Sequence, residues 1–131
     1  KGFEMSMNLY VEGTRKATVK VKGKRKTITD STKFSLWQTP TQLTYEVLEL
    51  PTIEQQINAY IEWAKSISKP YEDNVYDYNA LPDENWEYPV IGRVMVDPAK
   101  EHVTEFRDWL KMCQDEEHTV KFYMVWLWKN F

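Results

Sequence analysis

The sequence predicts an α+β fold of two layers, in which an N-terminal antiparallel meander continues into a mixed sheet and two helices cover one face. Three observations predict it: alternating apolar and polar residues over much of the first fifty positions, two segments with helical apolar spacing, and an apolar segment near the C-terminus. The 131 residues are 42% apolar and 15% aromatic, which is enough for one core. We therefore expect residues 1–131 to form a single domain.

A first strand is expected at residues 3–11. A second strand, residues 17–22, is expected to form a hairpin with the residues that follow Gly23. Residues 3–11 and 17–22 both alternate apolar with polar side chains, as strands with one buried face do. A two-residue turn at positions 23–24 would place Lys22 opposite Arg25. That register keeps the apolar side chains of both strands on one face.

Two further short strands are expected at residues 34–37 and 43–47. The second alternates Leu43, Tyr45 and Val47 with polar neighbours. Turn-forming residues and a proline separate these strands from each other and from the hairpin. The first fifty residues therefore predict an antiparallel meander with one face that needs a cover.

Two amphipathic helices are expected to provide that cover. The first begins at Thr52, which has capping-box spacing to Gln55, and the second begins at Asp97 with Pro98 in its first turn. Their apolar stripes follow helical intervals: Ile53, Ile57, Tyr60, Ile61, Ala64 and Ile67 in the first helix, and Ala99, Val103, Phe106, Leu110 and Cys113 in the second.

The second helix is flanked by expected strands at residues 88–96 and 120–128. Apolar residues occupy both faces of the later strand, which is typical of a central strand. Strand, helix and strand would form a C-terminal unit whose parallel crossover is right-handed.

Charge is divided unevenly along the chain. Residues 1–50 carry nine basic and five acidic side chains, whereas residues 51–131 carry eight basic and fifteen acidic ones. Seven of the basic residues fall within residues 15–26, which contain no acidic residue. We expect a basic patch there, with Lys20, Lys22 and Arg25 on one face; its members are Lys20, Lys22, Lys24 and Arg25.

Residues 70–88 form a long stretch without helical or strand periodicity. They contain six carboxylates, four tyrosines, one tryptophan and no basic side chain. Loops of this length are usually functional or disordered, and the aromatic residues argue against disorder. The expected partner-binding residues of this acidic aromatic loop are Tyr71, Tyr76, Asp77, Tyr78, Asp83, Glu84 and Trp86. The alternative is an ordered loop whose rings pack on the sheet or the helix ends.

Catalytic and metal-binding patterns are weak. Cys113 lies on a buried helical stripe, and His118 lies in an acidic turn where exposure is expected. His102 and Glu105 share a helical face but have no second matching pair. The four glycines are not grouped into a phosphate-binding loop. We therefore expect no cofactor and no metal, and an enzyme is not favoured.

The expected cellular setting is cytoplasmic. The apolar run at residues 120–127 is interrupted by Lys121 and is too short to cross a bilayer, so no membrane contact is expected. The start of the chain lacks the continuous apolar segment of a signal peptide, and one cysteine permits no internal disulfide. These features predict a soluble protein in a reducing compartment.

Three functions are compatible with the sequence. The favoured one is a non-enzymatic interaction protein that self-associates, or binds a basic protein partner, through the acidic aromatic loop and the basic hairpin. The first alternative is a nucleic-acid-binding protein that uses the hairpin of residues 15–26. The second is a small-ligand binder or enzyme with a site under residues 70–88.

Overall fold

The computed structural model describes residues 3–37 and 39–130, and the surroundings of the side chains for residues 7–37 and 39–126. Within these residues the elements are β1 Phe3–Val21, β2 Lys24–Ser35, α1 Thr41–Glu49, α2 Ile53–Ser66, β3 Tyr71–Tyr76, β4 Val90–Val96, α3 Pro98–Asp115 and β5 Thr119–Asn130. A three-stranded sheet has the order β2-β1-β5, and β3 and β4 form a separate two-stranded sheet. The α+β class and the C-terminal order of strand, helix and strand are confirmed.

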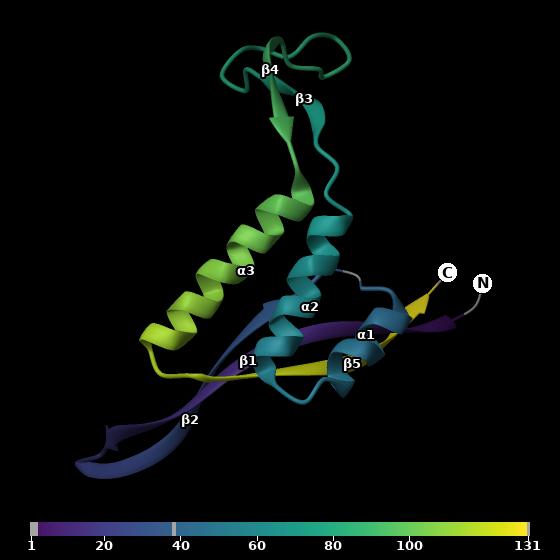
Figure 1. The fold of residues 1–131 in the computed structure, drawn as a ribbon. Coiled ribbons are helices and arrows are strands. Elements are labelled where there is room, and N and C mark those ends of the chain that lie inside the picture. Colours follow the sequence, from purple (N-terminus) through teal and green to yellow (C-terminus); the bar gives the residue numbers. More distant parts are fainter. Residues whose placement is uncertain (1–2, 38, 131) are drawn as a thin grey trace.

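The core lies between the three-stranded sheet and the helices, which cover one of its faces (Figure 1). Leu9 and Val11 of β1 are fully buried, and Phe122 of β5 is 4% exposed. The helices contribute Val47, Tyr60, Ile61, Ala64, Val103, Phe106, Trp109 and Cys113 to the same cluster. Burial of this apolar surface is the main force that holds the helices on the sheet.

The two predicted helices are confirmed, together with their N-caps. The Thr52 hydroxyl accepts a hydrogen bond from the backbone N–H of Gln55 at 3.2 Å, and the Asp97 carboxylate accepts one from Lys100 at 3.3 Å. These caps satisfy backbone donors that have no partner within the helix. None of the helices in the described part of the chain is both long and apolar enough to span a membrane.

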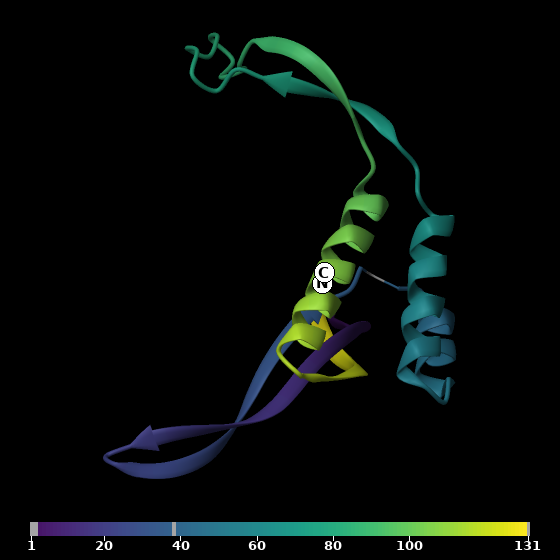
Figure 2. The same ribbon diagram turned by 60° about the vertical axis from the view of Figure 1, so that its left-hand side comes forward.

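Two hairpins project from the body at opposite ends (Figures 1 and 2). One is the outer part of β1 and β2, residues 15–30, which extends beyond the last pairing of β5 at Thr14 and Thr119. We call it the basic hairpin. The other is the arm, residues 71–96, in which β3 and β4 carry a loop between them and connect α2 to α3.

The register of the basic hairpin differs from the predicted one. Lys20 pairs with Arg25 and Val21 pairs with Lys24, so the turn consists of Lys22 and Gly23 instead of positions 23–24. Both turn residues have positive φ, 50° and 78°, which is the requirement of the tight turn whose twist matches that of the flanking strands. The predicted pairing of Lys22 with Arg25 is therefore wrong.

Residues 43–47 are helical, although a strand was expected. Leu43 and Val47 are four positions apart, so they share a helical face as readily as alternate positions of a strand. Val47 is fully buried. The Thr44 hydroxyl donates a hydrogen bond to the backbone carbonyl of Pro40 at 3.1 Å and lies 2.6 Å from the Thr39 hydroxyl, with which it is also hydrogen-bonded. The apolar spacing of this segment fits a helix and a strand, and packing against the core selects the helix. In the described part of the chain, three helices instead of the expected two cover the sheet.

The expected mixed sheet and parallel crossover are also wrong, because every strand pairing among the described residues is antiparallel. Strand β4 pairs with β3 in the arm, and β5 pairs with β1. Strand β5 lies at the edge of its sheet and not in the centre. On the face of β5 that points away from the helices, Tyr123 stacks on Tyr10 of β1, with ring centroids 5.8 Å apart.

Candidate functional site

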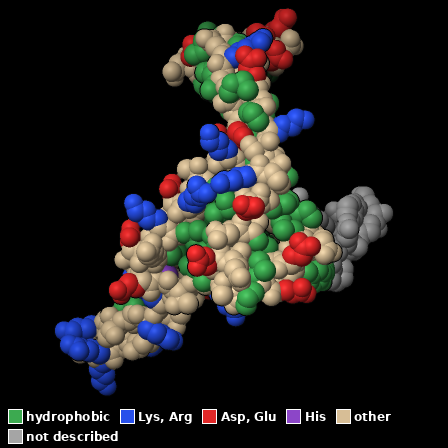
Figure 3. Space-filling view, viewed as in Figure 1, with side chains coloured by type: hydrophobic (Ala, Val, Ile, Leu, Met, Phe, Trp, Pro, Cys, Tyr) green, Lys and Arg blue, Asp and Glu red, His purple; other side chains and the backbone are tan. Residues whose placement is uncertain are grey.

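The predicted site residues lie on the two projections, which are far apart within one molecule. Figure 3 shows Lys and Arg side chains gathered at the end of the basic hairpin, and apolar and acidic side chains on the arm, with a basic side chain among them. No ion pair in the described residues joins the two projections. The predicted basic patch and the predicted acidic residues of the loop therefore lie on separate projections, although each projection also contains an ion pair of its own: Arg15 with Asp30 on the hairpin and Arg93 with Glu72 on the arm.

The outer part of the basic hairpin carries the predicted patch. Lys20 and Arg25 are direct ladder partners and share a face, whereas Lys24 lies on the other face opposite Val21. Lys22 is in the turn and not on the face of Lys20. All four basic residues of the patch are exposed.

The base of the hairpin is ordered by charged hydrogen bonds, one of which joins it to the body. Arg15 donates from Nε to the Asp30 carboxylate at 3.0 Å and from a terminal nitrogen to the backbone carbonyl of Glu116 at 2.9 Å. Lys16 donates to the Thr29 hydroxyl at 3.0 Å. The cations of the outer part have no ion pair within the described residues, so they are available to a partner.

The arm exposes large apolar side chains. Tyr78 is 71% exposed, Leu81 90% and Trp86 81%. On β4, Ile91 is 65% and Met95 61% exposed. A two-stranded sheet is only marginally stable in water by itself, and this one has no helix packed on its faces (Figure 2).

The loop of the arm is ordered by its own acidic residues. The Asp83 carboxylate accepts hydrogen bonds from the backbone N–H groups of Asn85 at 2.8 Å and Glu87 at 2.9 Å. Asp77 accepts one from Asn79 at 3.0 Å. Two of the predicted binding carboxylates therefore stabilise turns, because side-chain oxygens of Asp can replace backbone acceptors there.

The aromatic residues of the arm pack on one another and not on the body. Tyr78 and Tyr88 lie edge to face with ring centroids 5.0 Å apart, and Tyr76 is 6.1 Å from Tyr78. Trp86 has a left-handed backbone, φ 63°, which is uncommon for a bulky residue. The alternative of rings lying over the sheet or helix ends is thus wrong.

Three of the seven predicted loop residues line one hollow on the arm. Tyr76, Tyr78 and Trp86 line an open hollow of about 450 Å³; the other lining residues are Asn74, Glu87, Tyr88 and Val90. Glu84 is exposed and lies two positions before Trp86 in the sequence. Tyr71 is the first residue of β3, at the base of the arm, and is 50% exposed.

Sequence reasoning missed the apolar residues of β4. The strand at residues 88–96 was expected in the main sheet as part of the C-terminal unit, which would have covered Ile91, Val94 and Met95. In the structure they are exposed. No pattern in the sequence distinguishes a strand buried in its own chain from one left open.

The histidines are less exposed than the sequence suggested. The side chain of His118 is 2% exposed, with Nε2 3.7 Å from the Asp30 carboxylate and Nδ1 3.8 Å from that of Glu116. His102 stacks on Trp37 with ring centroids 5.5 Å apart. Burial lowers the pKa of His102, while the charge of Glu105 acts in the opposite direction.

Cys113 is buried, as predicted, and burial raises the pKa of its thiol, with a further contribution from the charge of Glu116. Among the described residues no three His, Cys, Asp or Glu side chains are grouped as ligands for a metal ion. The thiol packs within the buried core cluster, as a small apolar group does.

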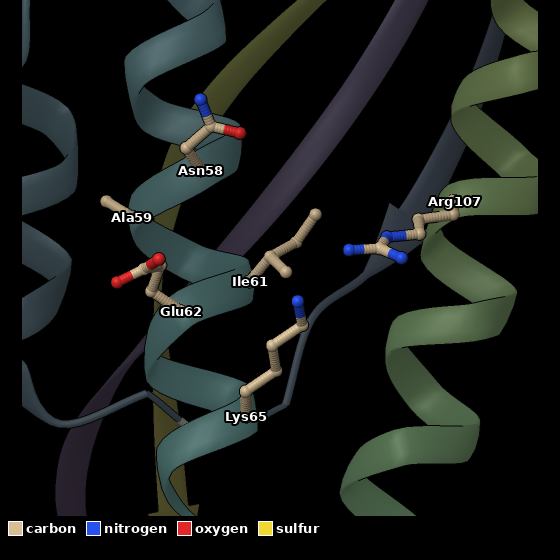
Figure 4. Close-up of a pocket in the computed structure, with 6 residues that line it drawn as sticks. All are labelled: Asn58, Ala59, Ile61, Glu62, Lys65 and Arg107. Carbon is tan, nitrogen blue, oxygen red and sulfur yellow. The ribbon is translucent and has the colours of Figure 1, made fainter.

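A second basic feature lies between α2 and α3. Figure 4 shows Lys65 of α2 and Arg107 of α3 pointing toward each other across a hollow of about 430 Å³. Neither has an ion pair within the described residues. The sequence did not predict that these two cations lie together on the helical face. Because they lie on the helices and not on the sheet, they can serve as a charge-matched control for its cations.

Comparison with known proteins identifies no relative: the chain matches no protein-family model, no curated protein and no solved structure.

Proposed function

We propose that this protein is a non-enzymatic interaction protein that associates head to tail with further copies of itself, the arm of one copy docking on the basic hairpin of the next. The exposed apolar surface of the arm, with Leu81 90% and Trp86 81% exposed, supports this most strongly. Contiguous apolar surface of this kind marks interaction sites, and covering it would stabilise the two-stranded sheet.

The basic hairpin offers a matching surface on one of its two faces. Val21 is 49% exposed and Ile28 39% exposed, and both lie on the face that also carries Val19. On the same face Lys24 pairs with Val21 and Lys26 pairs with Val19. An apolar strip flanked by lysines can receive apolar side chains and the carboxylates next to them.

The arm supplies those carboxylates. Glu84 and Glu87 are exposed and flank Trp86 in sequence. The arm and the hairpin are different surfaces at opposite ends of the molecule, so their contact is heterologous. Repetition of a heterologous contact produces a closed ring or an open filament.

Sedimentation velocity over a concentration series at low salt tests the proposal. We expect the wild type to form species larger than a monomer, and the double variant L81S/W86S to remain monomeric while still folded, because both side chains are exposed. The matched control is Y45S, since Tyr45 is 43% exposed on α1, away from both projections. A wild type that is strictly monomeric contradicts self-association, and a control that dissociates like the double variant contradicts association through the arm.

A charge exchange tests the pairing of the two surfaces. We expect K24E/K26E and E84K/E87K each to be monomeric, because each brings like charges together at the contact. A mixture of the two variants restores one contact with exchanged charges and one with the original charges, so it should associate. Failure of the mixture, with both variants folded, would show that the arm does not dock on the hairpin.

We also propose a cytoplasmic setting. The one cysteine, Cys113, is a buried free thiol, which fits a compartment in which thiols are kept reduced. Fractionation of expressing cells checks it, and recovery outside the cytoplasm would refute it.

A further inference from the structure

The face of the three-stranded sheet that points away from the helices is open. Leu9 and Val11 of β1 are buried beneath the helices, so the alternation of the strand places Tyr10 and Glu12 on the opposite face. No described element covers that face in Figures 1 and 2. We call it the open sheet face.

The register extends this face from the body to the end of the basic hairpin. Side chains that pair across an antiparallel ladder share a face, and Glu12 pairs with Lys33 on one side and Lys121 on the other. Farther along β1, the same alternation reaches Lys16 and then Lys20, which pairs with Arg25. The cations of the open sheet face are Lys16, Lys20, Arg25, Lys33 and Lys121.

Acidic side chains are nearly missing from the open sheet face. By register, Glu12 is the one carboxylate there among the residues whose side chains are described. The remaining positions between the cations are mostly hydroxyl residues, such as Thr14, Thr18 and Thr27. The face therefore has a positive potential, although the whole chain has a formal net charge of −3.

An aromatic pair lies among these cations. Tyr10 and Tyr123 are direct ladder partners, and their rings are stacked with centroids 5.8 Å apart and an interplanar angle of 21°. Both side chains are half-buried, so they are held in place by neighbours but still reach the surface. Rings in an open, basic sheet surface are platforms on which unpaired bases can stack.

We propose that the open sheet face binds single-stranded nucleic acid, with bases stacked at Tyr10 and Tyr123 and phosphates along the cations toward the end of the hairpin. From Tyr10 to Lys20 the strand spans about 33 Å at roughly 3.3 Å per residue. The two-stranded hairpin is twisted in both ribbon views, and a flexible single strand can follow a twisted ribbon better than a stiff duplex can.

The like-charged pair of Lys20 and Arg25 supports the same proposal. Like charges directly across a ladder destabilise it, and neither residue has an ion pair within the described residues. A phosphate chain along this face would neutralise both. The self-association proposed above uses the other face of the hairpin, which carries Lys24 and Lys26, so the two contacts are compatible.

Fluorescence anisotropy of a labelled oligothymidine of roughly 16 nucleotides, the upper end of a single-domain site, tests this. The variant K33A/K121A removes two cations beside the tyrosines and leaves the hairpin intact. We expect weaker binding and a dependence of log affinity on log salt that is shallower by about 1.4, from about 0.7 per phosphate contact. The matched control is K65A/R107A, which removes the same charge from the helical face and should leave affinity and salt dependence unchanged.

The aromatic pair is tested separately. We expect Y123L to lower the affinity roughly tenfold without changing the salt dependence, whereas Y123F, which keeps the ring, should bind like the wild type. Melting temperatures of both variants establish that they are folded. An equal loss in Y123L and Y123F, or an equal loss in K33A/K121A and K65A/R107A, would overturn the proposed face.

Measurement on L81S/W86S separates this proposal from self-association. We expect this variant to bind the oligonucleotide as the wild type does, because the arm is remote from the open sheet face. No binding by wild type and variant alike at low salt, tighter binding of duplex than of single strand, or binding only of an acidic protein would each overturn the proposal while leaving the association data unaffected.

Discussion

Lys20 and Arg25 face each other directly across the ladder of β1 and β2, near the end of the basic hairpin. Replacing one of two paired like charges by an opposite charge relieves the repulsion. We expect R25E to raise the free energy of unfolding by about 0.2–1 kcal/mol, with the larger gain at low salt. Urea unfolding at two salt concentrations measures it. The control is K24E, whose ladder partner Val21 is uncharged; an equal gain in this control would rule out the pairwise explanation.

Gly13 is required by close packing between β1 and the end of α3. A Cβ at this position would lie 2.9 Å from the Cys113 sulfur and 3.1 Å from the His118 Cβ. We therefore expect G13A to lower the free energy of unfolding by about 1–3 kcal/mol through overpacking. The comparison is G92A on the arm, where an added Cβ meets nothing within 4 Å. Similar unfolding midpoints for the two variants would show that the packing at Gly13 adapts.

His102 should make stability depend on pH. Burial lowers its pKa in the folded state, with Glu105 opposing the shift, so the folded protein keeps the ring neutral where an unfolded chain would protonate it. The free energy of unfolding is then highest above the unfolded value of about 6.5 and is lost as pH falls from there through the lowered pKa. Carboxylates also titrate in acid, so the informative quantity is the difference from H102F.

Chemical unfolding of both proteins at pH 8 and pH 5 measures that difference. We expect the wild type to lose more stability than H102F on acidification. Equal losses would mean that the ring is protonated at no cost in the folded state.

The Tyr60 hydroxyl is a buried hydrogen-bond acceptor for the segment that follows β2. Its hydroxyl oxygen accepts a hydrogen bond from the backbone N–H of Trp37 at 3.1 Å, and burial raises the pKa of Tyr60 to about 12, with the bond to Trp37 acting in the opposite direction. We expect Y60F to lower the free energy of unfolding by about 1–3 kcal/mol, because the N–H loses its partner. The exposed Y45F is the control, and a wild-type midpoint for Y60F would indicate that water replaces the hydroxyl.

The helices α2 and α3 were predictable because their signals are local. Thr52 and Asp97 cap the turns that follow them, and each apolar stripe depends on residues within a few positions of one another. Residues 43–47 show the limit of that reasoning. Leu43 and Val47 suit a strand or a helix equally, and the burial of Val47 against the sheet decided between them.

The candidate site was predictable in composition but not in position. The basic and acidic segments could be counted from the sequence, and their separation in space agrees with the expectation. That Asp77 and Asp83 hold the loop of the arm together, and that Tyr10 joins Tyr123 beside Lys121, depends on strand and turn geometry. Register of this kind is set by pairing between distant segments.

The sequence by itself determined the caps, the buried stripes and the division of charge, because each arises from neighbours along the chain. Only the tertiary structure decided which strands pair, and thereby that β4 leaves the body in an arm while β5 joins β1. The physical reason is that alternation specifies that a strand face is covered without specifying the partner that covers it. Pairing between distant strands depends on the competition among all strands for the same edges.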